Sequence, residues 1–190
     1  PPAHGEFAQA IQRAADGHPL AIALLAGEYD VSAVPQEDFL HNWQDELAAA
    51  RKSGLAGHHV TFATAFERSY AHLTQALQRA LSALSIFPFP FFAEGAAFIL
   101  DDTLILLEEV PEQKLAAARQ TLHELSRRSL LEVEGTFEDG TPATWRFQPA
   151  LRQEAARRLT DEAQKESQAR GYAAYGAWFV ALSVDEISKQ

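Results

Sequence analysis

The chain has 190 residues, of which 47% are hydrophobic and 22% charged, and its formal net charge is −10. This composition is typical of a globular protein with a hydrophobic core, so it excludes a disordered or fibrous chain. The absence of cysteine excludes disulfides, thiolate zinc sites and a cysteine nucleophile. No apolar run approaches the roughly 20 residues of a membrane-spanning helix, and the N-terminus lacks the pattern of a secretion signal. We therefore expect a cytoplasmic protein without a membrane partner.

Residues 1–57 are predicted to form a helical-bundle segment. Apolar residues recur at helical spacing over residues 7–15, and Asp16-Gly17 is expected to end that helix. Pro19 should lie in the first turn of a second, largely apolar helix, which Gly27 and the stretch 29–35 are expected to break. A third helix is predicted over residues 36–52.

Residues 73–92 form the segment around which we expect the rest of the chain to pack. Leucines at positions 73, 77, 81 and 84 lie on one stripe of a helix. Pro88 should end that helix, because it disfavours the helical conformation of the preceding residue. Four phenylalanines at positions 87, 89, 91 and 92 follow, and we expect neighbouring helices to cover them.

Residues 58–160 are predicted to form a winged-helix domain. A helix near residues 60–70 precedes the central segment, and helices over residues 93–100 and 112–128 follow it. Residues 130–133 and 144–147 are expected to pair as strands around the turn at Asp139-Gly140. Three helices followed by a two-stranded hairpin is the order of elements in a winged helix. Residues 101–110 fit either a loop or a helix.

Residues 161–190 are predicted to form a C-terminal helical segment. A long helix should begin at Pro149, and an aromatic helix containing Tyr172, Tyr175 and Phe179 follows it. Small residues between the aromatic ones suit close helix packing. The segment fits either the first member of a helical repeat array or a single helix that covers the winged-helix domain. The fold class predicted from the sequence is therefore mostly α, with one β-hairpin.

The sequence contains no enzymatic motif. It has no G-x-x-x-x-G-K-[ST] stretch to hold phosphates and no nucleophile elbow around a serine. The adjacent His58 and His59 suit a solvated loop better than a metal site. The pair Asp101-Asp102 is explained more simply by exposed caps than by acid and base catalysis. We expect no catalytic residue, no metal and no cofactor bound by these residues alone.

Several segments, in order along the chain, resemble the STAND class of signalling ATPases, which includes the NB-ARC proteins. They are Gly17-His18-Pro19-Leu20-Ala21 and residues 66–73, 81–88, 122–133 and 146–159. The resemblance implies the helical-bundle and winged-helix portion of a bacterial-type member, downstream of an ATP-binding domain that this chain does not contain. The absence of methionine, the initiator residue included, favours a piece of a longer protein. ATP and ADP are the cofactors implied for the intact protein.

The resemblance also implies two positions near the nucleotide. In the family the proline of the first signature packs against the adenine, which assigns that role to Pro19, although this residue also serves as an ordinary helix-starting proline. Many members carry a histidine-aspartate pair after the hairpin, and the histidine reaches the ADP phosphate. The matching residues here are Gln148 and Pro149. Gln148 can donate a hydrogen bond but brings no positive charge to a phosphate.

The function implied by the resemblance is that of a regulatory, non-catalytic switch. The winged helix would move as a rigid body relative to the nucleotide-binding domain, with ATP and ADP favouring different positions. The expected partners are that domain, C-terminal repeats and, on activation, further copies of the protein.

The alternative is the DNA-binding winged helix of a transcription regulator. Three residues of the predicted helix 112–128 are the candidates for contacts with phosphates or guanine edges: Arg119, Arg127 and Arg128. Against this reading, Glu112 and Glu124 share that helix. Glu138 and Asp139 also occupy the tip of the wing, where DNA-binding proteins carry lysine or arginine. Nucleic acid is therefore the less favoured partner.

Overall fold

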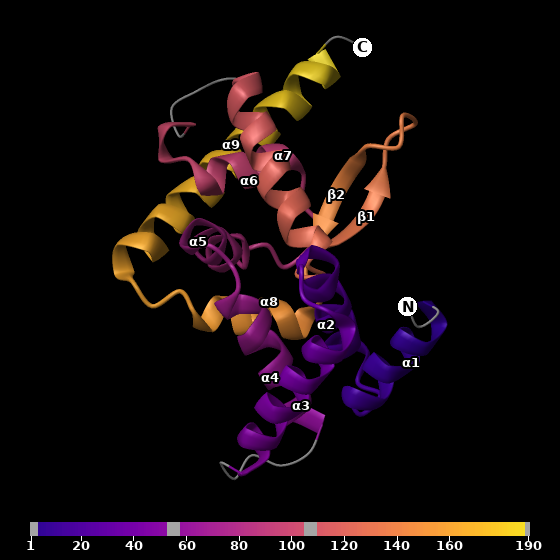
Figure 1. Cartoon of the computed structure of the whole chain (residues 1–190). Coiled ribbons are helices and arrows are strands. Elements are labelled where there is room, and N and C mark those ends of the chain that lie inside the picture. The colour runs from indigo at the N-terminus through magenta and orange to yellow at the C-terminus, as the bar shows by residue number, and fades with distance from the viewer. Residues whose placement is uncertain (1–3, 53–57, 105–109, 189–190) are drawn as a thin grey trace. The chain divides into compact units, whose positions relative to one another are not determined.

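The structure is a computed structural model that describes residues 4–52, 58–104 and 110–188 (Figure 1). It is mostly helical, and its described strands form one antiparallel hairpin. The chain divides into two compact units. The helical unit comprises Pro1–Leu73 with Arg127–Leu130, and the winged-helix unit comprises Thr74–Ser126 with Leu131–Gln190. The sequence analysis predicts this fold class correctly.

The helical unit contains the helices α1 (His4–Ala14), α2 (Pro19–Val31), α3 (Gln36–Lys52) and α4 (His58–Ala71). Asp16 and Gly17 follow α1 with positive φ angles, which is how a chain commonly leaves a helix. Pro19 occupies the first turn of α2, as predicted. The His18 side chain caps this helix by accepting a 3.4 Å hydrogen bond from the Ala21 amide.

Helix α2 continues through Gly27 and ends at Val31, within the predicted stretch 29–35, so only the break predicted at Gly27 is wrong. A Cβ atom on Gly27 would lie 2.5 Å from the carbonyl carbon of Arg128 and 2.8 Å from its oxygen. Glycine is needed here because a distant stretch of backbone passes against the helix, and a helix interior tolerates glycine at a modest cost.

Helix α4 packs against α2 and α3 and so belongs to the helical unit (Figure 1). Its buried side chains include Val60, Ala65 and Phe66. The indole N–H of Trp43 donates a 2.8 Å hydrogen bond to the carbonyl of Ala14, which joins α3 to α1. The compact units therefore divide at Leu73–Thr74, whereas the sequence analysis places the boundary at residues 57 and 58. The difference arises because the apolar face of α4 has its partners on the preceding helices.

The winged-helix unit begins with α5 (Gln75–Leu84), α6 (Ala93–Leu100) and the 3₁₀ turn η1 (Asp102–Leu104). It continues with α7 (Glu112–Arg127), β1 (Glu132–Thr136), β2 (Pro142–Arg146), α8 (Pro149–Arg157) and α9 (Glu162–Ser188). The last residue of α7, Arg127, belongs to the helical unit. Thr74 caps α5 through its hydroxyl, so this helix begins just after Leu73 and not at it. Helix α8 ends at Arg157 and is shorter than the long helix predicted from Pro149.

The hairpin pairs Glu132 with Arg146 and Val133 with Trp145. Its turn contains Gly140 with φ of 81°, as the Asp139-Gly140 pair predicts. Two backbone hydrogen bonds, of 2.8 and 3.0 Å, join Trp145 to Phe91 and dock the segment between α5 and α6 on the hairpin.

The prediction that all four phenylalanines after α5 are covered is only half correct. Phe87 and Phe91 are buried, and their rings stack with centroids 4.4 Å apart. Phe89 and Phe92 are 76% and 41% exposed. The backbone bends at Pro88 and Phe89, which brings the flanking rings together and turns the Phe89 side chain outward.

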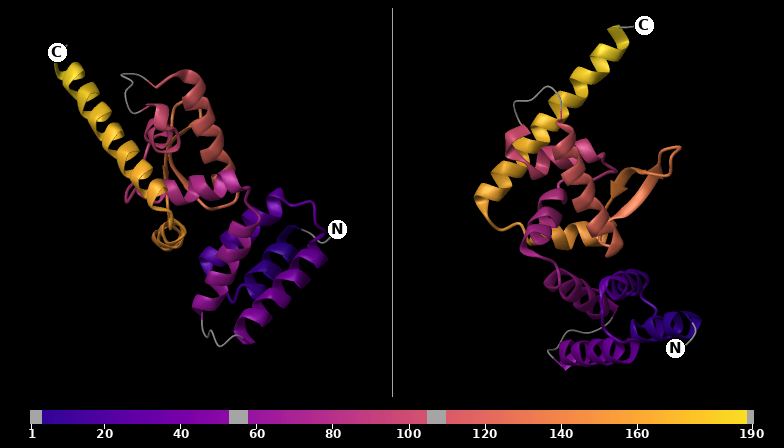
Figure 2. Two further views of the ribbon diagram at one scale, coloured as in Figure 1. Left: turned by 90° about the vertical axis from the view of Figure 1, so that its left-hand side faces the viewer. Right: turned by 45° about the horizontal axis from the view of Figure 1, so that its top comes forward.

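Helix α9 packs along α6 and also contacts α5 and η1 (Figure 2). Its Tyr172 and Tyr175 make edge contacts with Phe87. In this structure residues 162–188 therefore belong to the winged-helix unit, and their role as the start of a repeat array stays a prediction. No described helix is both long and apolar enough to cross a membrane. Residues 105–109 of the ambiguous segment and the side chains of His58 and His59 lie outside the described part.

Candidate functional sites

Pro19 is exposed at the start of α2, where the sequence places it. Beside it, the His18 ring stacks with Phe62 of α4 at a centroid distance of 5.7 Å. This end of α2 thus carries an exposed proline next to two stacked aromatic rings. The adenine contact itself stays a prediction.

Gln148 is half-buried and its side chain is already engaged. Its amide nitrogen donates a hydrogen bond to Oε1 of Glu132, whose other oxygen accepts a 2.9 Å bond from Arg146. One of the two N–H groups of this amide is thus held by a carboxylate, which leaves at most the other for a phosphate. Gln148 belongs to the winged-helix unit and Pro19 to the helical unit, so the two candidate nucleotide contacts belong to different compact units.

The three candidate arginines for DNA contact have different surroundings. Arg119 is exposed, and its guanidinium lies 3.4 Å from Glu112. Arg127 lies 3.3 Å from Asp30 of α2. Arg128, like Arg127, belongs to the helical unit, whereas Arg119 belongs to the winged-helix unit. The guanidinium groups of Arg119 and Arg127 thus each lie beside a carboxylate.

The tip of the hairpin is acidic. Glu138 and Asp139 are both exposed. One oxygen of Asp139 accepts a 2.7 Å bond from the Thr141 hydroxyl and a 2.9 Å bond from its amide. These hydrogen bonds, the hydroxyl's first, hold the pKa of Asp139 below its ordinary value, so the carboxylate is charged at neutral pH. A negative tip repels nucleic acid phosphates.

The helical unit contains a buried ion network that the sequence analysis does not find. Nε of Arg68 donates to both oxygens of Glu28, at 2.9 and 3.0 Å, and both side chains are only 8% exposed. Nη1 of Arg68 lies 2.6 Å from Glu46, and Nδ1 of His72 lies 2.8 Å from Glu28. The guanidinium also lies 4.9 Å from the centroid of Phe39. The network thus joins α2, α3 and α4.

A cavity of about 630 Å³ opens beside this network. Apolar side chains of Val31, Val34 and Phe39 line it together with the charged groups. Its size suits a small molecule. Glu28, which follows the apolar stretch 20–26 of α2, is the one signal for this network, because a buried carboxylate requires a partner. That signal does not identify Arg68, forty residues along the chain.

A second cavity, of about 460 Å³, lies between α7 and the hairpin. Arg119 and His123 line it from α7, and Phe137, Pro142 and Trp145 line it from the hairpin. The sequence analysis considers Arg119 only as a DNA contact, and it has no signal that places a cavity beside this residue.

Among the described residues, no three histidine, aspartate or glutamate side chains are grouped closely enough to hold a metal ion. In comparisons with known proteins, no family model matches the chain and no curated protein matches it significantly.

Proposed function

We propose that this chain is the regulatory, non-catalytic switch portion of a STAND-class signalling ATPase. The observation that carries the proposal is the order of its two compact units. A helical unit whose α2 begins at Gly17-His18-Pro19 precedes a winged-helix unit, which is the order that the resemblance implies. A division into compact units suits a switch that works by rigid-body displacement.

In this proposal the intact protein binds ATP or ADP through a nucleotide-binding domain outside the chain. Pro19 contributes an apolar surface to the adenine. Gln148 replaces the usual histidine and makes a weaker, uncharged contact with the phosphates or none, because Glu132 competes for its amide. The protein works in the cytoplasm and associates with further copies of itself when activated.

The first test is to read the gene that encodes the chain upstream of Pro1. The proposal requires a G-x-x-x-x-G-K-[ST] stretch between a predicted strand and a predicted helix, because that loop holds the phosphates. A parent gene without such a loop would contradict the assignment to this class.

The alternative function, DNA binding by the winged helix, is disfavoured by charge. The hairpin tip carries Glu138 and Asp139, and Arg119 and Arg127 lie against carboxylates. We therefore expect no change in the fluorescence anisotropy of a labelled random duplex at low salt. Micromolar binding that weakens steeply with salt would favour the alternative, because phosphate contacts release counterions. Arg119→Gln would then reduce the affinity, while Arg157→Gln on α8 serves as a control.

A further inference from the structure

The indole N–H of Trp145 is a buried donor with no acceptor among the described residues. The residue is only 3% exposed. Indole nitrogen can donate but not accept, and it cannot rotate independently of the ring to find another partner. Trp43, by contrast, donates to Ala14 at 2.8 Å. Since buried donors are rarely left unpaired, the unused N–H of Trp145 requires an explanation.

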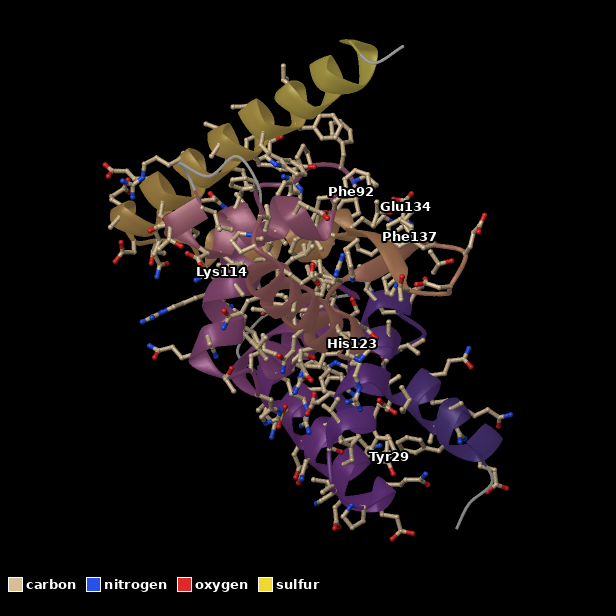
Figure 3. All side chains as sticks on the ribbon, turned by 90° about the horizontal axis from the view of Figure 1, so that it is seen from above. Tyr29, Phe92, Lys114, His123, Glu134 and Phe137 are labelled. Atoms are coloured by element: carbon tan, nitrogen blue, oxygen red, sulfur yellow. The ribbon has the colours of Figure 1, made fainter. Side chains whose placement is uncertain are left out.

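Trp145 lines the cavity between α7 and the hairpin, and two of its neighbours there carry or can acquire positive charge. Among the described residues, Arg119 pairs with one carboxylate, that of Glu112 at 3.4 Å, and its side chain is 48% exposed. His123 is exposed one helical turn further along α7 (Figure 3). The Trp145 ring, a guanidinium and an imidazole therefore line one cavity, and the positive charge of Arg119 favours an anionic acceptor.

The opposite wall restricts the charge of that acceptor. Asp139 lines the same cavity and carries a negative charge that its hydrogen bonds to Thr141 stabilise. A doubly charged phosphate group would be repelled more strongly by this carboxylate than a single carboxylate would be. A cation would be opposed by Arg119. The charges thus favour a monoanion.

The remaining walls are apolar and aromatic. Phe137 and Pro142 line the cavity beside the Trp145 ring, and Phe137 is 56% exposed. Exposed aromatic side chains at the edge of a cavity are available to stack on a ligand ring. The volume of about 460 Å³ is large enough for one aromatic ring with a short acidic side chain.

We propose that the cavity between α7 and the hairpin binds a small aromatic carboxylate. The carboxylate accepts hydrogen bonds from the Trp145 indole and the Arg119 guanidinium, and the ring packs between Phe137 and Pro142. The indole nitrogen has almost no accessible surface in the unliganded cavity, so the side chains that cover it must rearrange to admit the carboxylate. This site does not depend on the nucleotide switch proposed above.

The test is an NMR titration of the full chain with 3-phenylpropionate. The three tryptophans give three indole N–H signals, which report separately on each ring. We expect a saturable shift of the Trp145 signal and no comparable shift of the Trp43 signal. 3-Phenylpropionamide and inorganic phosphate should each bind at least tenfold more weakly, because the first lacks the charge and the second lacks the ring.

Two variants separate a specific site from general binding. Arg119→Gln removes a cation at an exposed position, so the fold should be kept, and the affinity for 3-phenylpropionate should fall by tenfold or more. Arg157→Gln removes an exposed cation from α8 and should leave the affinity unchanged. The proposal is overturned if the Trp145 signal does not move, if the amide shifts it equally, if phosphate binds as tightly, or if both variants behave alike.

Discussion

Glu28 and Arg68 are charged residues whose side chains are removed almost entirely from water. Each is 8% exposed in the ion pair, so neither is solvated as it would be in the unfolded chain. Such a pair adds little net stability relative to apolar side chains, but removing one partner leaves an uncompensated buried charge. His72 and Glu46 complete the hydrogen bonding of the pair.

We predict that Glu28→Ala lowers the free energy of unfolding by about 3–5 kcal/mol, because it leaves Arg68 buried without its main partner. Asp45→Ala is the matched control. Asp45 and its partner His41 are both exposed. The Asp45→Ala substitution should therefore change the free energy of unfolding by less than about 1 kcal/mol. Denaturation with urea measures both.

The double variant Glu28→Met with Arg68→Met should be more stable than Glu28→Ala, because apolar replacement of both partners removes the stranded charge. If Glu28→Ala is no more harmful than Asp45→Ala, the pair is not buried in solution as it is in the structure.

Asp101, between α6 and η1, provides a pH-dependent contribution to stability. A hydrogen bond from Lys114, followed in importance by one from the Thr103 hydroxyl, lowers the pKa of this carboxyl. A folded-state pKa below the unfolded value stabilises the fold above the unfolded pKa. The contribution is lost as the pH falls through the folded pKa, hence below about pH 4.

We predict that Lys114→Met raises the pKa of Asp101 towards its ordinary value, measured by NMR titration of the carboxyl carbon. The difference in unfolding free energy between pH 6 and pH 3 should shrink in this variant. Lys165→Met, which removes an exposed partner of Glu162, should leave the pKa of Asp101 unchanged. An unaltered Asp101 pKa in Lys114→Met would show that Lys114 is not its main partner.

At the scale of elements, the packing of α9 on α6 depends on one glycine. Gly171 is buried, and a Cβ atom there would collide with the backbone carbonyl oxygen of Phe98 and lie 3.2 Å from the Cα of Ile99. These are backbone atoms of α6, which cannot move aside by rotating a side-chain bond, so the two helices would have to separate. Gly176 lies on the same helix, and a Cβ atom there would meet nothing within 4 Å.

These two glycines give a matched pair of variants. Gly171→Ala should destabilise the protein by about 1–3 kcal/mol, because α6 and α9 must separate. Gly176→Ala should stabilise it by up to about 1 kcal/mol, because alanine is the better helix former. Thermal unfolding of both variants tests the prediction. Equal effects of the same sign would mean that α9 does not pack on α6 as described.

Local signals predict the elements well. The bounds of α3 and α6 agree with the sequence, because helical periodicity and flanking turn residues lie within the same short window. The break predicted at Gly27 of α2 is wrong since Gly27 is required by the backbone of Arg128, which no local pattern reveals. The exposure of Phe89 depends in the same way on how the chain bends against Trp145.

The candidate sites are less predictable than the elements. Pro19 and Gln148 come from a resemblance, and their positions follow from the ends of helices. The network of Glu28 and Arg68 and the cavity beside Trp145 join residues from separate helices or from a helix and the hairpin. Periodicity identifies the face on which a residue lies but not its partner on another element.

At the scale of the whole molecule, the proposed switch requires two compact units that keep their own folds while a nucleotide changes their arrangement. Each unit has its own set of fully buried side chains, such as Trp43 and Phe66 in the helical unit and Phe98 and Leu122 in the winged-helix unit. Separate cores are what allow rigid-body displacement without unfolding.

The most direct test measures the distance between the two units in the full-length protein that contains this chain. Cysteines for spin labelling are introduced at Gln44 on α3 and Gln120 on α7, both of which are exposed, and this chain contributes no native cysteine that would also be labelled. A label pair at Gln12 and Gln44, within the helical unit, is the control. We predict that the Gln44–Gln120 distance distribution differs between the ADP state and a non-hydrolysable ATP state, while the control distribution does not. Identical Gln44–Gln120 distributions in the two nucleotide-bound states would contradict the proposed switch.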